Sequence, residues 1–413
     1  MTLQPRRRLL RYFAVFLILI AVFTLSLFLV YSLPEGRIAE NTESVLAAIR
    51  ESGTQFPPVW FPADEARIDQ FTDELMLSSV VPQDPDLNPL EAAMDMNNYP
   101  RYWHGYQVIL RPLLLVFSGY QLRFLYMTAF FLLLALALFR IRDEAGTVPA
   151  LALVAGLLAC YMMTISMCMQ HANNWLITFL ALLVMFRLRN RTDRPWDRPL
   201  FFLVVGMLTS FVDLLTVPLI TLCIPLSLLL LIDQNRDPDS NWKTAFKTLF
   251  RCSLAWGLGY ALCWASKWLI GSLVLGRNLL SEAADQISFR TVGNEEFPGG
   301  PVEAIKQNLI AFLRGLGLST HDLLPVILIL ALAALILTVC FFRGKKALAQ
   351  GSMQLLVAAY PLVWYAVTSN HAIIHASLLT YRHLVITLFS GILFFCAIID
   401  GDRLRRRLAA KKA

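Results

Sequence analysis

Apolar runs long enough to cross a lipid bilayer decide which folds are open to this chain. A membrane-spanning helix needs about 17–25 largely apolar residues, and the sequence offers such runs at 11–32, 122–141, 148–169, 173–188, 251–275, 322–342, 352–368 and 383–400. The run 199–232 is too long for one span and is interrupted by Asp213, Thr216 and Pro218. We expect it to form two helices that meet near 213–217. The pattern predicts an all-α, polytopic membrane protein with about ten transmembrane helices.

The composition agrees with a chain that lies mostly in lipid. Hydrophobic residues make up 57% and charged residues 16% of the sequence, whereas soluble domains carry roughly 25% charged residues. The net charge of +7 does not indicate a nucleic-acid-binding surface, because the basic residues flank apolar runs instead of forming a separate basic domain. We therefore expect membrane lipid, and no nucleic acid, as a partner.

The distribution of charge predicts the orientation of the spans. Cytoplasmic connections are rich in Lys and Arg, and the basic segments PRRRLLR, RLRNRTDRPWDR, FRGKK and RLRRRLAAKK fall on one side when about ten spans are assumed. The segment 33–107 falls on the other side, with 13 Asp and Glu against 4 Arg and no Lys. We expect a single domain over 1–413 in the plasma (inner) membrane, with both termini cytoplasmic. Its outer loops are 33–121 and 276–321, and the second resembles a mobile lid.

Motifs for several common chemistries are missing from the sequence. The seven cysteines lie in or beside apolar runs, so neither a disulfide framework nor a Cys/His zinc spacing is expected outside the membrane. A Walker loop, a GxGxxG fingerprint and a serine nucleophile elbow are missing as well. Coupling to a bound nucleotide is therefore not expected. The cofactor stays unknown, with a divalent metal ion as one candidate.

The first outer loop contains two expected helices and the carboxylates considered for catalysis. The stretch 41–49 is typical of a capped amphipathic helix at the membrane interface. A second helix is expected to begin near residue 70, with Thr72 or Asp73 as its cap. Asp73 has two interpretations, as a helix cap or as a catalytic or metal-binding carboxylate, and Glu74 is the weaker candidate.

Aromatic and cationic residues are dense between Tyr99 and Tyr106. Aromatic residues are ordinary at membrane interfaces, so they indicate little by themselves. Arg101 and His104 in the same stretch are candidates for binding a phosphate or a sugar, because a planar guanidinium matches phosphate oxygens.

Three further candidates lie in different connections. His171 belongs to the stretch 170–175, which we expect to be a tight outer turn with satisfied polar groups, with substrate contact as the alternative. Asp213 lies in apolar surroundings and has either a structural or a substrate-binding role. Arg290, in the Gly- and Pro-containing segment 276–321, is either a solvated surface residue or a phosphate ligand.

The segment from Asn370 to Arg382 joins two apolar runs and is unusually polar. If it is helical, His371, His375 and Arg382 fall within about 40° of one another around the axis. The histidines are then either hydrogen-bonded interface residues or ligand or metal contacts. Arg382 is the strongest phosphate candidate, and Asn370 and Tyr381 are further candidates for substrate binding.

The chain resembles the GT-C class of integral-membrane glycosyltransferases. The shared features are many spans, a long acidic first outer loop, interfacial helices and later outer-facing arginines. It is also similar to an uncharacterised group of bacterial multi-pass proteins through the strings TDxxML, YxRYWHGY, DxLTxP and NHxxxHxxxxTYR, which stand here at 72–77, 99–106, 213–218 and 370–382.

The GT-C resemblance implies a specific activity. Such an enzyme moves a sugar from a polyprenyl-phosphate donor to a saccharide, lipid or protein acceptor at the outer face of the membrane. The resemblance implies Asp73, with Glu74 as its substitute, as the base that deprotonates the acceptor or holds a metal. Arg101, Arg290 and Arg382 then stabilise the leaving phosphate, which needs positive charge more than it needs a proton.

Two other functions stay open at this point. A transporter or flippase of lipid-linked saccharides fits the interrupted 199–232 region, because broken helices often form substrate sites. Against transport, the polar residues gather at one face, and the sequence has no convincing internal repeat. A non-catalytic membrane subunit is the third option, and it leaves the outer histidines and arginines unexplained.

Overall fold

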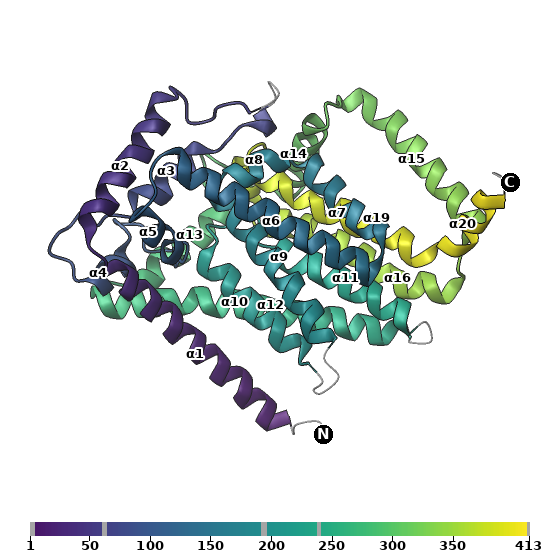
Figure 1. Ribbon diagram of the computed structural model, residues 1–413, viewed down its shortest axis with the longest axis horizontal. Helices are drawn as coiled ribbons and strands as arrows, with labels where there is room; N and C mark the ends of the chain where they lie inside the picture. Colours follow the sequence, from purple (N-terminus) through teal and green to yellow (C-terminus); the bar gives the residue numbers. More distant parts are fainter. Residues whose placement is uncertain (1–4, 60–63, 191–195, 238–240, 411–413) are drawn as a thin grey trace.

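The fold is a bundle of helices, as the apolar pattern predicts. The computed structural model describes residues 5–59, 64–190, 196–237 and 241–410, and within these ranges the chain is helical and contains no strand (Figure 1). Among the described residues, five helical segments are long and apolar enough to cross a membrane. They are α1 (Pro5–Tyr31), α6 (Tyr120–Ala145), α9 (Met169–Arg189), α12 (Trp242–Leu275) and η2 (Thr380–His383) continued by α19 (Leu384–Ile398). These features are those of a multi-pass membrane protein.

Two apolar runs form shorter helices than expected. The run 148–169 is divided between α7 (Thr147–Ala159) and the short α8 (Met162–Met167), and the run 352–368 is divided between α16 (Lys345–Ala358) and α17 (Tyr360–Val367). In contrast, α10 (Arg198–Val212), α11 (Ile220–Arg236) and α15 (Thr320–Phe341) follow the expected runs. At 1.5 Å per residue α7 is only about 20 Å long, less than the roughly 30 Å of a hydrocarbon core. The described ranges therefore support five crossings by length and apolarity, where the sequence led us to expect about ten. The expected division of 199–232 is confirmed, because α10 ends at Val212 and α11 begins at Ile220.

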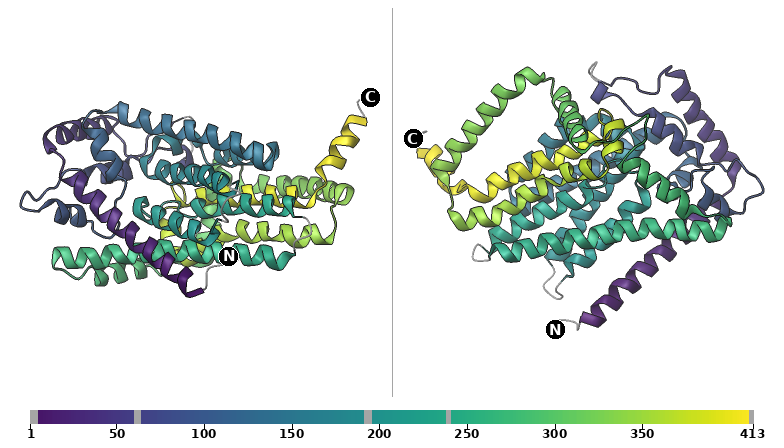
Figure 2. Two further views of the ribbon diagram at one scale, coloured as in Figure 1. Left: turned by 60° about the horizontal axis from the view of Figure 1, so that its bottom comes forward. Right: turned by 180° about the vertical axis from the view of Figure 1, so that it is seen from behind.

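Side chains at the centre of the bundle are buried, whereas many apolar side chains on its rim are exposed. Every residue of α11 from Ile220 to Ile232 is buried, as expected for a helix that is apolar on all sides and surrounded by neighbours. In contrast, α1 exposes large apolar side chains, among them Leu9 and Phe13, and diverges from the bundle toward its N-terminus (Figure 2). Side chains of this kind on the rim are typical of a surface that faces lipid.

Two glycines allow α10 and α12 to pack backbone against backbone. A Cβ atom at Gly206 would lie 2.2 Å from the carbonyl oxygen of Trp256, and one at Gly259 would lie 2.2 Å from that of Leu203. Small residues that permit such close approach are common between membrane helices, where dispersion contacts replace the hydrophobic effect as the attractive force.

Short helices cover one end of the bundle (Figure 1). They are α2 (Glu35–Glu51), η1 (Asp64–Ala66), α3 (Gln70–Ser78), α4 (Pro89–Asp95), α5 (Gln107–Leu114), α8 (Met162–Met167), α13 (Leu279–Thr291), α14 (Pro301–Gly315) and α18 (Ser369–Ile374). The expected amphipathic helix at 41–49 is part of α2, which buries Ile38, Val45 and Ile49 on one face. The segment 276–321, expected to be a loop, is largely α13 and α14.

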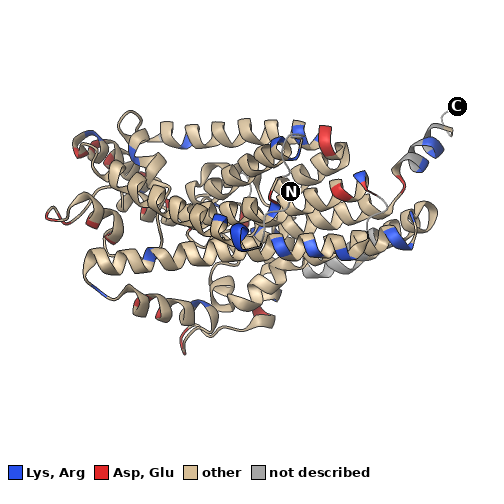
Figure 3. Ribbon diagram, turned by 90° about the horizontal axis from the view of Figure 1, so that it is seen from below, with Lys and Arg blue, Asp and Glu red and all other residues tan. Residues whose placement is uncertain are grey.

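Basic residues gather at the opposite end of the bundle (Figure 3). The guanidinium of Arg8 lies 2.7 Å from the Asp197 carboxylate and joins α1 to the start of α10. The backbone N–H of Arg343 donates to Ile398 O (2.8 Å), which places the FRGKK segment beside the end of α19 and the following α20 (Gly401–Ala410). The charge separation seen along the sequence is therefore a separation between the two ends of one bundle.

Candidate functional site

The first turn of α9 connects the polar clusters at the acidic end. The expected outer turn at 170–175, which contains His171, is wrong, because α9 begins at Met169 and the chain turns earlier, between α7 and α9. Tyr161 there has a φ of +58°, so the backbone leaves the helical path at a residue that is neither Gly nor Pro. A helix start presents unsatisfied N–H groups, and buried polar side chains from several helices meet at this one.

Asp73, in the neighbouring α3, accepts a hydrogen bond from a free N–H group at the start of α9. Its Oδ1 accepts a hydrogen bond from the N–H of Met169 (3.0 Å), and its Oδ2 lies 3.2 Å from the guanidinium of Arg123. Burial raises the pKa of Asp73 to about 7, the charge of Arg123 opposes this rise, and Asp69 adds to it. Neither Asp73 nor Thr72 caps α3 as expected, because Asp69 holds that position and accepts from the N–H of Thr72 (3.0 Å).

The surroundings of Asp73 leave little room for a substrate. A cavity of about 70 Å³ is lined by Arg123 and Met169, the two partners of Asp73, and by apolar side chains of α2. Pockets that hold small-molecule ligands measure about 300–1,000 Å³. Glu74 lies about 100° further round α3 and is half-buried, away from the start of α9. Asp73 is therefore placed to dock α3 onto α9.

Arg382 is enclosed by protein groups on all sides. Its Nε donates to Cys160 O (3.3 Å), its Nη1 to His171 Nε2 (3.1 Å) and its Nη2 to Glu65 O (3.0 Å). Only 1% of the residue is exposed. The hydroxyl of Tyr381 donates to the same carbonyl of Glu65 (3.0 Å). The arginine, the tyrosine and His171 thus fasten the start of α19 to α9 and to the first outer segment.

The segment 371–382 is not one continuous helix, so the condition under which His371, His375 and Arg382 would share one face is not met. The helix α18 ends at Ile374, and the chain turns through 375–379 before η2 begins at Thr380. His371 and His375 therefore lie together, with ring centroids 4.6 Å apart, while Arg382 belongs to the cluster with His171.

Arg290 contacts two histidines, His371 within α18 and His375 directly after the end of that helix. The Nε2 of His371 is 2.8 Å from Leu215 O, so this nitrogen carries the proton and Nδ1 accepts from Arg290 Nη1 (2.9 Å). The second Nη1 hydrogen of Arg290 is directed to His375 Nε2 (3.2 Å). Burial lowers the pKa of both histidines, that of His375 to about 4, and the charge of Arg290 acts in the same direction.

The neutral imidazoles leave the positive charge of Arg290 uncompensated. Both are hydrogen-bond acceptors toward Arg290, which is half-buried, and within the described residues its Nε and Nη2 atoms make no hydrogen bond. Two of its donor atoms are therefore available to an anion.

Asp213 positions this cluster through the break between α10 and α11. Its Oδ1 accepts from Asn174 Nδ2 (2.7 Å) and from the N–H and hydroxyl of Thr216 (3.0 and 2.8 Å), and its Oδ2 accepts from the Tyr260 hydroxyl (3.0 Å). These bonds hold Leu215 at a φ of +64°, with its carbonyl toward His371. Asp213 thus shapes the site without facing a ligand.

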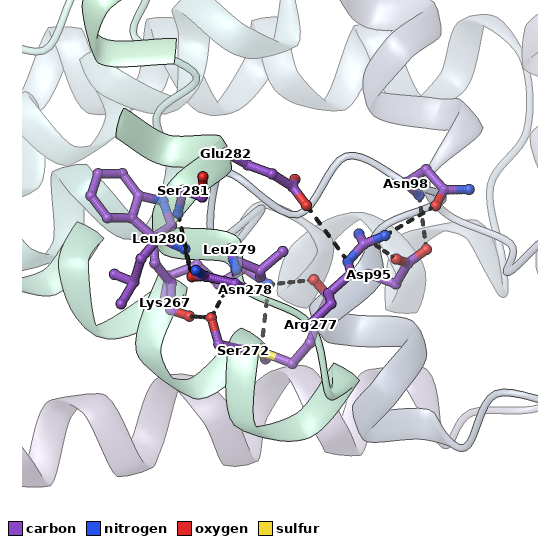
Figure 4. Close-up of polar contacts among 12 residues, drawn as sticks. Asp95, Asn98, Lys267, Ser272, Arg277, Asn278, Leu279, Leu280, Ser281 and Glu282 are labelled. Atoms are coloured by element: carbon purple, nitrogen blue, oxygen red, sulfur yellow. Dashed lines mark hydrogen bonds and ion pairs between the residues drawn. The ribbon is translucent and has the colours of Figure 1, made fainter. Parts of the chain in front are cut away.

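Both ends of α13 are anchored, which fixes Arg290 in place. At the start, Arg277 lies 2.9 Å from Asp95 of α4 and Asn278 caps the helix (Figure 4). At the end, Ser369 Oγ donates to Thr291 O (2.6 Å) and Asn370 Nδ2 donates to Phe289 O (2.8 Å). Asn370 therefore acts on the site by holding α13.

Arg101 approaches the same region from the first outer segment. Its guanidinium carbon lies 4.3 Å from the ring centre of Tyr99 and 5.9 Å from that of Tyr102. Among the described residues it has no carboxylate partner. Burial raises the pKa of Tyr102, whereas Arg290 and Arg101 are both near enough to lower it. The charges of two arginines that are far apart in sequence thus act on one tyrosine.

An aromatic cluster adjoins Arg101. Tyr102 stacks on Trp264, with ring centroids 5.5 Å apart and an interplanar angle of 16°. The indole N–H groups of Trp264 and Trp268 donate to Arg101 O (2.6 and 3.0 Å), which fixes the backbone at that residue. Sequence reasoning missed Trp264 because it lies within an apolar run, where a tryptophan is indistinguishable from ordinary membrane packing.

His104 has a structural role, because both of its ring nitrogens bond to nearby residues of the same segment. Its Nε2 donates to Tyr99 O (2.9 Å), so its Nδ1 accepts from the Tyr106 hydroxyl (2.6 Å). Burial lowers the pKa of His104 to about 3. The ring is fully buried and neutral, and both of its nitrogens are occupied, which leaves no atom for the phosphate or sugar contact expected from the sequence.

The structure therefore divides the expected site residues into separate groups. Arg290, His371 and His375 form one group through direct contacts, and Arg101 is joined to it through its charge, which acts on the same Tyr102 as that of Arg290. We call these four residues the arginine–histidine cluster. Asp73 lies in a second group at the start of α9, and Arg382 lies in a third with His171 and Tyr381. No group of three His, Cys, Asp or Glu side chains suited to a metal ion occurs in the described part of the chain.

Comparisons with known proteins give no family. No family model matches the chain, and neither the curated proteins nor the solved structures contain a match to it.

Proposed function

We propose that the protein is a GT-C-like glycosyltransferase that takes a sugar from a polyprenyl-phosphate donor at the outer face of the plasma membrane, with both termini in the cytoplasm. The observation that carries the proposal is the arginine–histidine cluster. Arg290 is held by two neutral histidines, Arg101 lies over the rings of Tyr99 and Tyr102, the charges of both arginines act on Tyr102, and neither arginine is neutralised by a carboxylate in the described part of the chain.

The geometry suits a phosphate that carries a sugar. A lipid phosphate leaves with negative charge, and unpaired guanidinium donors in a partly desolvated position stabilise that charge as the bond to the sugar breaks. The half-buried ring of Trp264, which stacks on the buried ring of Tyr102, offers an apolar face for the C–H groups of the sugar ring. His371 and His375 hold Arg290 without cancelling its charge.

The donor site in this proposal differs from the one that the GT-C resemblance implied. Asp73 and Arg382 belong to the other two groups, where their polar atoms bond to backbone and neighbouring side chains. Asp73 and Arg382 therefore stabilise the fold, and Arg101 and Arg290 bind the phosphate. The acceptor remains a saccharide, lipid or protein hydroxyl.

Transport is the less favoured function because the buried polar side chains of the bundle bond to one another. The hydroxyls of Thr209 and Thr221 are 2.8 Å apart, and those of Ser227 and Ser390 are 2.7 Å apart. Paired in this way, they do not form a polar path from one end of the bundle to the other.

The test uses the full-length protein in proteoliposomes that contain polyprenyl-phosphate-linked hexoses. Arg290→Ala is expected to lower kcat/KM for sugar transfer about 100-fold, the usual cost of removing one donor to a developing anion. Arg50→Ala is the matched control, because Arg50 is an exposed arginine at the same end that pairs with Glu43. Near-normal transfer by Arg290→Ala would refute the site. Movement of the labelled donor across the bilayer without its consumption would identify a flippase.

A further inference from the structure

A second binding site lies at the basic end, between α1, α10 and α12. We propose that it binds an anionic phospholipid, with the headgroup phosphate on Lys247 and Arg251 and an acyl chain in the adjoining groove. This site is separate from the arginine–histidine cluster, and the proposal does not depend on the function proposed for that cluster.

The headgroup end of the site is a basic recess of about 220 Å³. Its charged lining consists of the cations Arg8, Arg198, Lys247 and Arg251 and the carboxylate Asp197. Four positive charges against one negative charge leave a net charge of +3 in the recess.

Two of the cations in the recess have no counter-charge. Asp197 is already bound by Arg8 (2.7 Å) and by the hydroxyl of Tyr12 (2.6 Å), and Arg198 pairs with Asp233. Lys247 and Arg251 are exposed, and neither has an ion-pair or hydrogen-bond partner in the part of the chain that the structure describes. They stand four residues apart on α12 and therefore face each other on one side of the helix, where like charges repel. An anion bound between them removes this repulsion.

The recess continues into an apolar groove of about 260 Å³. The two share Arg8, Pro199 and Arg251 in their linings, so they are contiguous. The rest of the groove is lined by Tyr12, Leu203, Leu254, Ala255 and Leu258. Leu254 and Leu258 are exposed on the outside of the bundle, where the groove is open to lipid.

The three helices change from basic to uncharged at the same level. In α12 no charged residue follows Arg251 until Lys267, in α10 none follows Arg198 before the helix ends, and in α1 none follows Arg11. Because Arg8, Arg198 and Arg251 line one recess, this level is shared and marks the boundary between water and hydrocarbon. A phospholipid changes from phosphate to acyl chain at that same boundary, and basic pockets between membrane helices are known to favour anionic headgroups.

The charge arm of the test compares two double variants of the full-length protein. Binding of dioleoylphosphatidylglycerol, dioleoylphosphatidylcholine and free glycerol phosphate is followed by native mass spectrometry from a neutral detergent. Wild-type protein is expected to prefer the phosphatidylglycerol about tenfold over the phosphatidylcholine. The double variant K247E/R251E is expected to lose this preference. The matched control R343E/K345E makes the same change of charge on exposed residues at the same end and is expected to keep it.

The second part of the test fills the apolar groove with a larger side chain. Leu258→Trp is expected to lower the affinity for phosphatidylglycerol at least about threefold, whereas Leu269→Trp, at an exposed position of α12 outside the groove, leaves it unchanged. Equal preference in K247E/R251E and wild type would overturn the proposal. So would binding of free glycerol phosphate as tight as that of the lipid, which would indicate an anion site without a chain site. Unchanged thermal unfolding midpoints in the variants show that a lost preference does not come from misfolding.

Discussion

The burial of Asp73 leads to a quantitative prediction about the dependence of stability on pH. An aspartate in an unfolded chain titrates near pH 3.9, whereas burial raises the pKa of Asp73 to about 7 in the folded protein. Between these two values the folded state binds one proton more than the unfolded state, so the free energy of unfolding falls as the pH rises. The contribution is about 4 kcal/mol over the whole window and about 1.4 kcal/mol between pH 6 and pH 9.

Asp73→Asn removes this titration while keeping the shape of the side chain. The amide has one acceptor oxygen and cannot reproduce both contacts of the carboxyl group, to Met169 N and to Arg123, which costs about 1–3 kcal/mol independently of pH. The pH-dependent part is separate from this constant loss. The unfolding midpoint of Asp73→Asn relative to wild type is therefore expected to rise by roughly 2 °C from pH 6 to pH 9.

The assay is thermal unfolding followed by tryptophan fluorescence in detergent micelles at pH 6, 7, 8 and 9. Glu74→Gln is the matched control, because Glu74 is the half-buried next residue of the same helix, and its difference from wild type is expected to stay constant. A difference for Asp73→Asn that does not change with pH would refute the reasoning. Sugar transfer per folded molecule is expected to stay within about threefold of wild type, whereas a catalytic base would cost about 100-fold or more.

Three further substitutions test the packing and the structural clusters, each by its unfolding midpoint. Gly206→Ala is expected to destabilise the fold by about 1–3 kcal/mol, because its Cβ meets a backbone carbonyl of α12, whereas Gly257→Ala, with no atom within 4 Å of its Cβ, is neutral or stabilising. Arg382→Met is expected to cost about 3 kcal/mol or more by leaving buried acceptors unpaired, while KM for the donor stays unchanged in the folded fraction. Asp213→Ala is expected to destabilise by a similar amount and, unlike Arg382→Met, to lower transfer by displacing the Leu215 carbonyl.

The sequence predicts the class of fold and the position of some breaks, but it does not predict the lengths of the helices. Asp213 and Pro218 mark the junction of α10 and α11, because a carboxylate and a proline are both unfavourable inside an apolar helix. The break at Tyr161 has no such marker, since the residues around it are as apolar as those of a continuous span. Hydropathy measures how long a run stays apolar and contains no information about where its backbone hydrogen bonds are interrupted.

The sequence predicts which residue types form the candidate site, but it predicts only partly which of these residues lie together. His371 and His375 are four residues apart and meet as expected, because a single turn of helix suffices to align them. Arg382 lies beyond a turn of the chain, and its partners Glu65, Cys160 and His171 come from distant segments. Pairings of this kind depend on the tertiary packing of four helices, which the spacing of residues along the chain cannot specify.

The arginine–histidine cluster can bind an anion because the side chains that contact its arginines are uncharged. Between residues 33 and 107 acidic residues outnumber arginines 13 to 4, so an arginine at this end has many carboxylates available to it. Arg123 and Arg277 are paired in this way, with Asp73 and Asp95. An anion that binds such a pair must displace a carboxylate and lose the energy of the existing interaction.

Arg290 and Arg101 avoid that loss because their neighbours are uncharged. The neighbours of Arg290 are imidazoles kept neutral by burial, and those of Arg101 are the rings of Tyr99 and Tyr102. An imidazole orients the guanidinium through a hydrogen bond, and an aromatic face does so through its quadrupole, while the full positive charge is kept. A change of His375 to Glu would provide the missing carboxylate at the same place. His375→Glu is therefore expected to weaken donor binding more than His375→Ala does, and the opposite order of KM values would contradict an anion site.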